Sequence, residues 1–292
     1  MSKDIQPGHS KNVSFEVFRY QLVIDQAFQS DAFQHQYHNA DELKHAKNKI
    51  FQSIISENNF SFNSPKSEIT SQLVHQSGDM FYFKVNVRRD RKIPKKDFTE
   101  ALIDTYPSML VVVNNHPDVQ KIAVQSNLDA FKKTNIVANF IQETVQKHIK
   151  SYNIAFAVEP TFEAQQFWNL VRQYPKRVTQ VTFSLISPNN PSLTKDLQLD
   201  LKTLHGDTNT QKTTLELNAE KDSYLVLNEE SELVNSIVDY AAKGGGDIKM
   251  KVAGVSRKFH TAQSVKDFNM EEQLLKTNDW DAINAAFKNI LI

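Results

Sequence analysis

Segments with a two-residue apolar period alternate along this chain with segments of helical period, and this mixture restricts the fold more than any other feature. Residues 13–24 are rich in β-branched and aromatic side chains, which predicts a strand. Apolar residues at helical spacing predict an amphipathic helix at residues 40–57. Two strand-like runs, at residues 68–75 and 80–87, flank a short turn that contains Gly78, which predicts a β-hairpin.

The rest of the chain has the same mixed character. Further strands are predicted at residues 108–113, 122–124, 153–158, 178–186, 213–217, 224–227 and 247–255. Further helices are predicted at residues 97–105, 127–151, 163–174, 192–204, 231–242 and 271–292. From residue 153 the order is β-α-β, a helical insert and β-α-β, which predicts a split, ferredoxin-like arrangement. The expected class is therefore α+β.

A length of 292 residues suggests two domains or one large one. We expect an N-terminal β-rich domain with a hairpin and a basic segment, a long connecting helix, a ferredoxin-like α+β domain and a C-terminal helical tail. Their predicted bounds are residues 1–125, 126–152, 153–256 and 257–292.

The tail predicts an amphipathic helix with a broad apolar side. Its apolar residues are Leu274, Leu275, Trp280, Ile283, Phe287 and Leu291. A helix with such a side must bury it on the body of the protein or on a second copy. We therefore expect a homodimer with this helix as the contact.

The chain has no cysteine, which excludes disulfides, thiolate metal sites and cysteine nucleophiles. It has no run of about 18 apolar residues, so we expect no membrane insertion. Residues 1–12 are polar and lack the apolar segment of a secretory signal. These features together favour a cytoplasmic location.

The formal net charge is zero, but the charges are not spread evenly. Residues 84–150 hold twelve basic and seven acidic residues, and most of this excess lies in the segment 84–96. Such clustering is typical of proteins with an anionic partner, most often nucleic acid. The alternative interpretation is a solvated segment that protects a strand edge from aggregation.

The basic segment begins on the predicted exposed face of the strand at residues 80–87 and continues beyond its end. The predicted nucleic-acid-binding residues are Tyr82, Lys84, Arg88, Arg89, Arg91, Lys92, Lys95 and Lys96. Their expected role is to neutralise phosphates without reading bases, DNA being favoured over RNA. Few aromatic residues lie nearby, with Phe98 and Tyr106 beyond the run, so the support for base stacking is small.

Three histidines, His35, His38 and His45, lie close together in the sequence. They match no four-ligand zinc spacing, so we expect surface histidines and no metal. The glycines 244–246 follow a predicted helix and precede a strand, which indicates a helix C-cap, because phosphate-binding loops precede a helix. The sequence contains no dinucleotide, P-loop or serine-hydrolase motif, so we expect no cofactor.

Two sets of acids are candidates for a metal-dependent nuclease. The first is Glu159, Glu163 and Asp207, and the second is Glu68 and Asp79 with Lys84. Neither set supplies every role that such chemistry needs. The sequence assigns no catalytic residue, and binding is favoured over catalysis.

The order of short apolar segments between residues 105 and 255 resembles the A protein of the phage Rex exclusion system and related bacterial anti-phage defence proteins. The segments that carry it are TYPSMLVVVNN, KIAVQ, AFAVEP, RVTQVTFSL and LTKDLQLDLKTL. The resemblance implies a DNA-binding, dimer-forming component of a phage-defence system. It includes no diagnostic motif, so no catalytic residue can be transferred.

The leading hypothesis is a protein that binds nucleic acid through its phosphates and acts in phage defence. The first alternative is a metal-dependent nuclease or toxin-like effector. The second is a protein-interaction subunit whose basic segment meets an acidic chain, for example another protein of the defence system.

Overall fold

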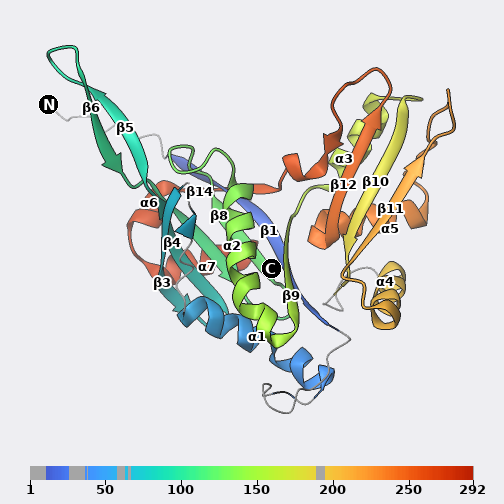
Figure 1. Cartoon of the computed structure of the whole chain (residues 1–292), viewed down its shortest axis with the longest axis horizontal. Helices are drawn as coiled ribbons and strands as arrows, with labels where there is room; N and C mark the ends of the chain where they lie inside the picture. Colours follow the sequence, from blue (N-terminus) through green and yellow to red (C-terminus); the bar gives the residue numbers. More distant parts are fainter. Residues whose placement is uncertain are drawn as a thin grey trace, which may run out of the picture.

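The computed structural model describes residues 11–25, 37, 39–57, 63–64, 67–188 and 195–291. The chain forms an eight-stranded sheet, a four-stranded sheet and a two-stranded ribbon, with helices on the two larger sheets (Figure 1). This arrangement confirms the α+β class.

The long strand β1 (Asn12–Ile24) organises the eight-stranded sheet. One of its edges pairs antiparallel with β8 (Lys121–Gln125). The other edge pairs first with β14 (Asp267–Glu271) and then with β9 (Ile154–Pro160). Strands from the expected ferredoxin-like domain and from the expected tail thus complete the sheet that the N-terminal segment begins.

Beyond β8, the sheet continues with β7 (Ser108–Asn114), β4 (Met80–Val87), β3 (Ser67–Ser77) and β2 (Asn63–Ser64). Strands β3 and β4 form the predicted hairpin, and Gly78 in its turn has φ = 58°. This left-handed conformation suits glycine because it lacks a Cβ atom.

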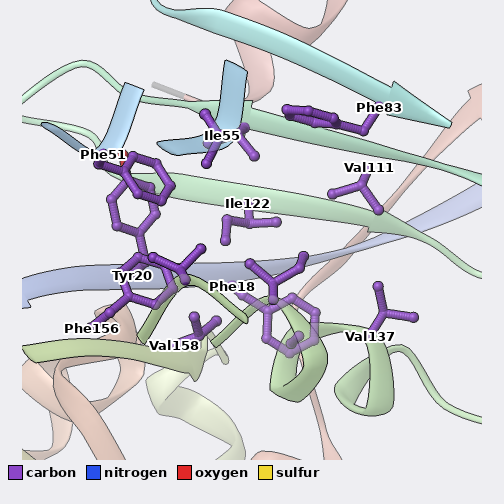
Figure 2. Packing of buried hydrophobic residues seen from close by; sticks show 14 of the residues in the cluster. Phe18, Tyr20, Phe51, Ile55, Phe83, Val111, Ile122, Val137, Phe156 and Val158 are labelled. Atoms are coloured by element: carbon purple, nitrogen blue, oxygen red, sulfur yellow. The ribbon is translucent and has the colours of Figure 1, made fainter. Parts of the chain in front are cut away.

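Two helices cover one face of this sheet, α1 (Ala40–Glu57) and α2 (Thr134–Ile149). Figure 2 shows their apolar side chains against those of β1 and the neighbouring strands, with Phe51 stacked on Phe156. Helix α1 has its predicted bounds. Helix α2 begins later than predicted, because residues 127–131 form turns that leave Leu128 exposed.

The C-terminal segment covers the opposite face. It consists of the short α6 (Glu272–Lys276) and α7 (Trp280–Ile290) where one continuous helix was predicted. The apolar side of α7 is buried against β1 and β4 of the same chain, with Phe287 in contact with Phe15 and Tyr82. This side is therefore not available as the predicted contact with a second copy.

The four-stranded sheet is antiparallel throughout. Its strands, in spatial order, are β11 (Lys212–Asn218), β10 (Val178–Ile186), β12 (Gly246–Val252) and β13 (Phe259–His260). The helices that pack on it are α3 (Ala164–Gln173), α4 (Lys195–Thr208) and α5 (Glu232–Tyr240). Short helical turns complete the chain: η1 (Lys150–Tyr152), η2 (Ala241–Gly245) and η3 (Thr261–Gln263).

This topology differs from the predicted ferredoxin-like arrangement. Strand β9 pairs with β1 in the large sheet, and both neighbours of β10 are antiparallel to it. The predicted arrangement needs two β-α-β units in one sheet, whereas the first unit is divided here, with β9 in the large sheet and β10 in the four-stranded sheet. Residues 224–227, predicted as a strand, donate a hydrogen bond from Leu225 N to Val178 O but have no strand geometry.

The ribbon consists of β5 (Arg89–Pro94) and β6 (Glu100–Thr105). The predicted helix at residues 97–105 is therefore wrong. A short amphipathic helix needs a surface on which to bury its apolar side. Here Leu102 and Ile103 stay exposed, and the segment obtains its backbone hydrogen bonds by pairing with β5 instead.

Within the described ranges, the helices are all too short or too polar to cross a membrane.

Candidate nucleic-acid interface

The basic segment forms one strand of a projecting arm, which we define as residues 88–106. Figure 1 shows β5 and β6 extending away from the large sheet at the upper left. The pairing runs from Arg89 opposite Thr105 to Pro94 opposite Glu100. Apart from half-buried positions near the base and at Ala101, the side chains of the arm are exposed.

Acidic residues on the returning strand pair with part of the basic segment. Arg88 Nη2 lies 3.0 Å from Asp104 Oδ2, and Lys92 Nζ lies 2.7 Å from Glu100 Oε2. The hydrogen bond and charge of Asp104 raise the pKa of Arg88. Because exposed ion pairs contribute only about 0–1 kcal/mol, these cations can exchange partners at small cost.

Arg89 has a structural position at the base of the arm. Its guanidinium donates through Nε to the carbonyl oxygen of Ala130 at 3.1 Å and also through Nη2. The same group lies 5.6 Å from the ring centroid of Phe131. Arg89 therefore attaches the arm to the loop before α2, and we no longer count it among the candidate phosphate contacts.

Arg91, Lys95 and Lys96 are exposed and form no ion pair within the part of the chain that the structure describes. The two lysines lie at the tip, where Lys95 N donates to Thr99 O at 2.8 Å. These three residues are the cations of the arm that an external anion can pair with directly.

Phe98 is the outermost aromatic residue of the arm. Its side chain is 98% exposed, and its backbone has φ = 63°. The turn is held by Asp97, whose carboxylate accepts hydrogen bonds from Thr99 N and Thr99 Oγ1. The turn thus presents a phenyl ring to solvent between two lysines and a threonine.

Further apolar side chains are exposed along the arm. They are Ile93, Leu102, Ile103 and Tyr106. Register places Ile103 opposite Arg91 on one face and Leu102 opposite Lys92 on the other, so each face carries a basic side chain beside an apolar one. An isolated two-stranded ribbon with this surface is suited to contact a partner rather than to form a core.

Tyr82, predicted to lie on an exposed face, is fully buried under α7. Its hydroxyl donates to Asn284 Oδ1 at 2.9 Å, and its ring packs against Trp280. The prediction failed because the terminal helix covers this face of β4. Lys84 lies on the same strand beyond the covered area and is exposed as predicted.

The first set of candidate nuclease acids does not form a cluster. Burial raises the pKa of Glu159 to about 7, against the opposing charge of Lys212. Glu163 forms an ion pair with Lys266 at 2.7 Å, and Asp207 is exposed near the end of α4.

The second set is also separated. Glu68 is at the opposite end of the hairpin from Asp79, which lies in the turn, while Lys84 pairs with Gln72 midway. His45 Nδ1 donates a hydrogen bond to the carbonyl oxygen of Asp41 at 2.7 Å, whereas His35 and His38 lie outside the described residues. Within the described ranges, no group of three His, Asp or Glu residues could hold a metal ion.

A polar cluster that the sequence did not indicate joins β12 to β13 and η3. Burial alone would raise the pKa of Asp247, but hydrogen bonds from His260 and from the hydroxyl of Thr261 lower it. Thr261 Oγ1 also accepts a hydrogen bond from Ile248 N at 3.0 Å. These bonds fix the edge of the four-stranded sheet, which is a structural role.

Sequence reasoning noted Phe98 but missed its position at the tip. Asp97 followed by Thr99 was the available signal, since an Asp side chain commonly accepts hydrogen bonds two residues further on in a turn.

Comparison with protein-family models, with curated proteins and with solved structures gave no match for this chain. The resemblance to the Rex A protein and related anti-phage proteins remains a prediction.

Proposed function

We propose that this protein binds nucleic acid through the arm, with DNA as the preferred ligand. The observation that carries the proposal is the exposed ring of Phe98 at the tip, beside the exposed Lys95 and Lys96, which form no ion pair with any described residue. The cations neutralise phosphates, and this contact is largely independent of sequence. The ring adds a contact that cations alone cannot make, because it can stack on a base or enter a base step.

The shape of the arm favours DNA over double-stranded RNA. The major groove of B-form DNA admits a two-stranded β-ribbon. The major groove of A-form RNA is deep and narrow, and side chains do not reach its base edges. A ribbon with cations and one aromatic tip therefore fits a DNA duplex, or an unpaired strand, better than an RNA duplex.

The test is a binding titration at several salt concentrations with the triple variant Arg91→Ala, Lys95→Ala and Lys96→Ala. Each phosphate contact contributes about −0.9 to the slope of log K against log salt, so the slope should shrink by about two to three. The matched control replaces three exposed lysines of the four-stranded-sheet region by alanine: Lys202, Lys221 and Lys258. An unchanged slope in the arm variant would show that these three cations of the arm do not contact the DNA phosphates.

Two further measurements define the ligand. Phe98→Ala should weaken binding to single-stranded DNA by about 1–3 kcal/mol if the ring stacks on a base, and should leave the salt slope unchanged. An RNA duplex of the same sequence should compete more weakly than the DNA duplex. Equal competition would contradict the preference for DNA.

A second candidate function is protein binding, and the exposed Leu102, Ile103 and Ile93 favour it. The partner would be a second copy, as the expected homodimer requires, or an acidic chain of another defence protein. Light scattering of the full chain at micromolar concentration tests the homodimer. A dimer that persists in Leu102→Ser would show that the arm is not its contact.

The resemblance to the Rex A protein and related proteins supports phage defence as the biological setting. In that setting, cells that express the chain should give fewer plaques than cells without it. The arm variant Arg91→Ala, Lys95→Ala and Lys96→Ala should lose this protection. Full protection by that variant would show that protection against phage does not depend on nucleic-acid binding through the arm.

A further inference from the structure

A cavity of about 630 Å³ lies where the large sheet meets the segments around α3 and α5. Its lining comes from β1, from residues 118–121, from residues 161–164, from α5 and η2, from residues 266–268 and from the end of α7. Backbone hydrogen bonds from Lys266 N to Thr161 O and from Val17 N to Lys266 O fix this wall. Its volume is within the range of about 300–1,000 Å³ that is usual for small-molecule sites.

Arg19 of β1 lines this cavity and is only 5% exposed. Its Nε and Nη2 atoms are buried without a hydrogen-bond partner, and the described residues provide no ion pair to its guanidinium. Its stem packs on Gly244, where a Cβ atom would lie 2.4 Å from Arg19 Cβ. With φ = 80° as well, this position suits glycine, so the backbone makes room for the arginine.

Among the residues that the structure describes, no acidic side chain forms an ion pair with Arg19. Burial lowers the pKa of Arg19, and the interactions with Tyr240 and Tyr20 offset this lowering only in part. Burial also raises the pKa of both phenols, so both are neutral at pH 7. Glu159 is opposite Arg19 in the ladder, but its carboxyl interacts with Lys212 and Asp247 instead.

Other cations of the lining increase the positive charge. Burial lowers the pKa of Lys121, and the charges of Arg19 and Lys266 lower it further. The lining also contains acids, and within the described residues none of them forms an ion pair with Arg19. Glu163 pairs with Lys266, Asp118 is near His116, Asp267 accepts from Ser14, and Asp239 lies on α5.

We infer that this cavity binds a small organic anion, with its phosphate or carboxylate group on the guanidinium of Arg19. Buried charges in proteins are paired, and arginine pairs with both anions through parallel N–H···O bonds. The apolar side chains of Val17, Phe162 and Phe268 line the same cavity and supply contacts for the rest of the ligand. This inference concerns a site away from the arm and is independent of the proposed function.

The experiment is thermal unfolding of the full chain in matched ionic strength with chloride, inorganic phosphate, pyrophosphate, acetate or citrate. A bound anion should raise the Tm of this 292-residue chain by about 4–5 °C at a hundredfold excess over its Kd. The phosphate and carboxylate series distinguish the two ligand groups. The probes lack the apolar part, so a concentration series is needed to reach saturation.

Variants assign the effect to Arg19. Arg19→Met should abolish the anion-dependent rise in Tm and leave the Tm in chloride unchanged or higher, because it removes an unpaired buried charge. Arg19→Lys should reduce the rise, since an ammonium cannot form the two parallel bonds. The exposed-site control Lys202→Met should keep the full rise.

Three outcomes would overturn the inference. The first is no specific rise in Tm for the wild-type chain with any anion of either series. The second is an equal rise in Arg19→Met, which would locate binding elsewhere. If Arg19 pairs with Glu159 in solution, Glu159→Gln lowers the Tm and the anions have no effect, which also rejects the proposal.

Discussion

Strand β4 is buried on both faces, whereas β5, which starts two residues after β4 ends, is exposed on both faces. Phe81 and Phe83 of β4 face the helices α1 and α2, and Tyr82 faces α7. Beyond Arg89, the side chains of β5 and most of those of β6 contact solvent. Arg88 is thus the single residue between a strand of the core and a strand of the projecting arm.

This difference separates residues that stabilise the fold from residues that are free to bind. Phe98 of the arm is 98% exposed and so contributes little hydrophobic free energy to folding, which therefore does not explain this residue. Free energies of unfolding can therefore test the contrast between β4 and the arm directly.

The largest expected effect is on β4. Phe83→Ala should lower the free energy of unfolding by about 3–5 kcal/mol, because it removes a fully buried ring and leaves a cavity. Denaturant unfolding followed by circular dichroism measures this. A loss below about 1 kcal/mol would mean that the core relaxes to fill the space and would weaken the contrast.

The next effect concerns charges in the body and in the arm. Burial raises the pKa of Glu159 from 4.5 to about 7, so the folded carboxyl holds its proton over a pH range in which the unfolded one is ionised. The free energy of unfolding therefore falls as the pH rises from 4.5 to about 7, by about 3 kcal/mol at about 1.4 kcal/mol per pKa unit.

Glu159→Gln removes the titrating carboxyl and with it this decrease in the free energy of unfolding with rising pH. We expect the variant to be more stable than the wild type by up to about 3 kcal/mol at about pH 8, with little difference at about pH 4. In the arm, Glu100→Gln breaks an exposed pair with Lys92 and should change stability by less than about 1 kcal/mol. Parallel pH profiles for wild type and Glu159→Gln would contradict the burial of this carboxyl.

The sequence predicted most elements of the fold, because their signals are local. The strand at β1, the helix α1, the hairpin of β3 and β4 and the strand β10 have their expected bounds to within a few residues. The ferredoxin-like arrangement failed because it required a choice of partner for β9. Its alternating apolar pattern suits either sheet, and pairing with β1 depends on residues far away in the sequence.

In the candidate site, too, local features could be predicted from the sequence, and contacts with distant residues could not. The position of the basic segment could be predicted, but the fate of each side chain could not. Tyr82 is covered by a helix whose Asn284 lies 202 residues further on, and Arg89 donates to the loop at Ala130. The partners Asp104 and Glu100 were visible in the sequence, yet their pairing requires the hairpin that the helix prediction excluded.

A smaller effect is expected from the hydroxyl of Tyr82, which donates to Asn284 inside the body. Tyr82→Phe should lower the free energy of unfolding by about 1 kcal/mol, the usual net contribution of one buried hydrogen bond. Tyr106→Phe at the base of the arm is the matched change at an exposed position and should have no measurable effect. Equal losses in the two variants would show that the base of the arm is packed in solution.

The smallest effect is expected at the tip and outer face of the arm. Phe98→Ala and Leu102→Ala remove apolar side chains that are 98% and 64% exposed, so each should change the free energy of unfolding by less than about 0.5 kcal/mol. Phe83→Ala is the internal reference, since it removes the same ring from the core. If Phe98→Ala costs more than about 1 kcal/mol, the arm folds back onto the body, and Phe98 is a packing residue. If stability is unchanged while DNA binding falls, the exposed ring acts on a partner, which is the role that its position at the tip of the arm indicates.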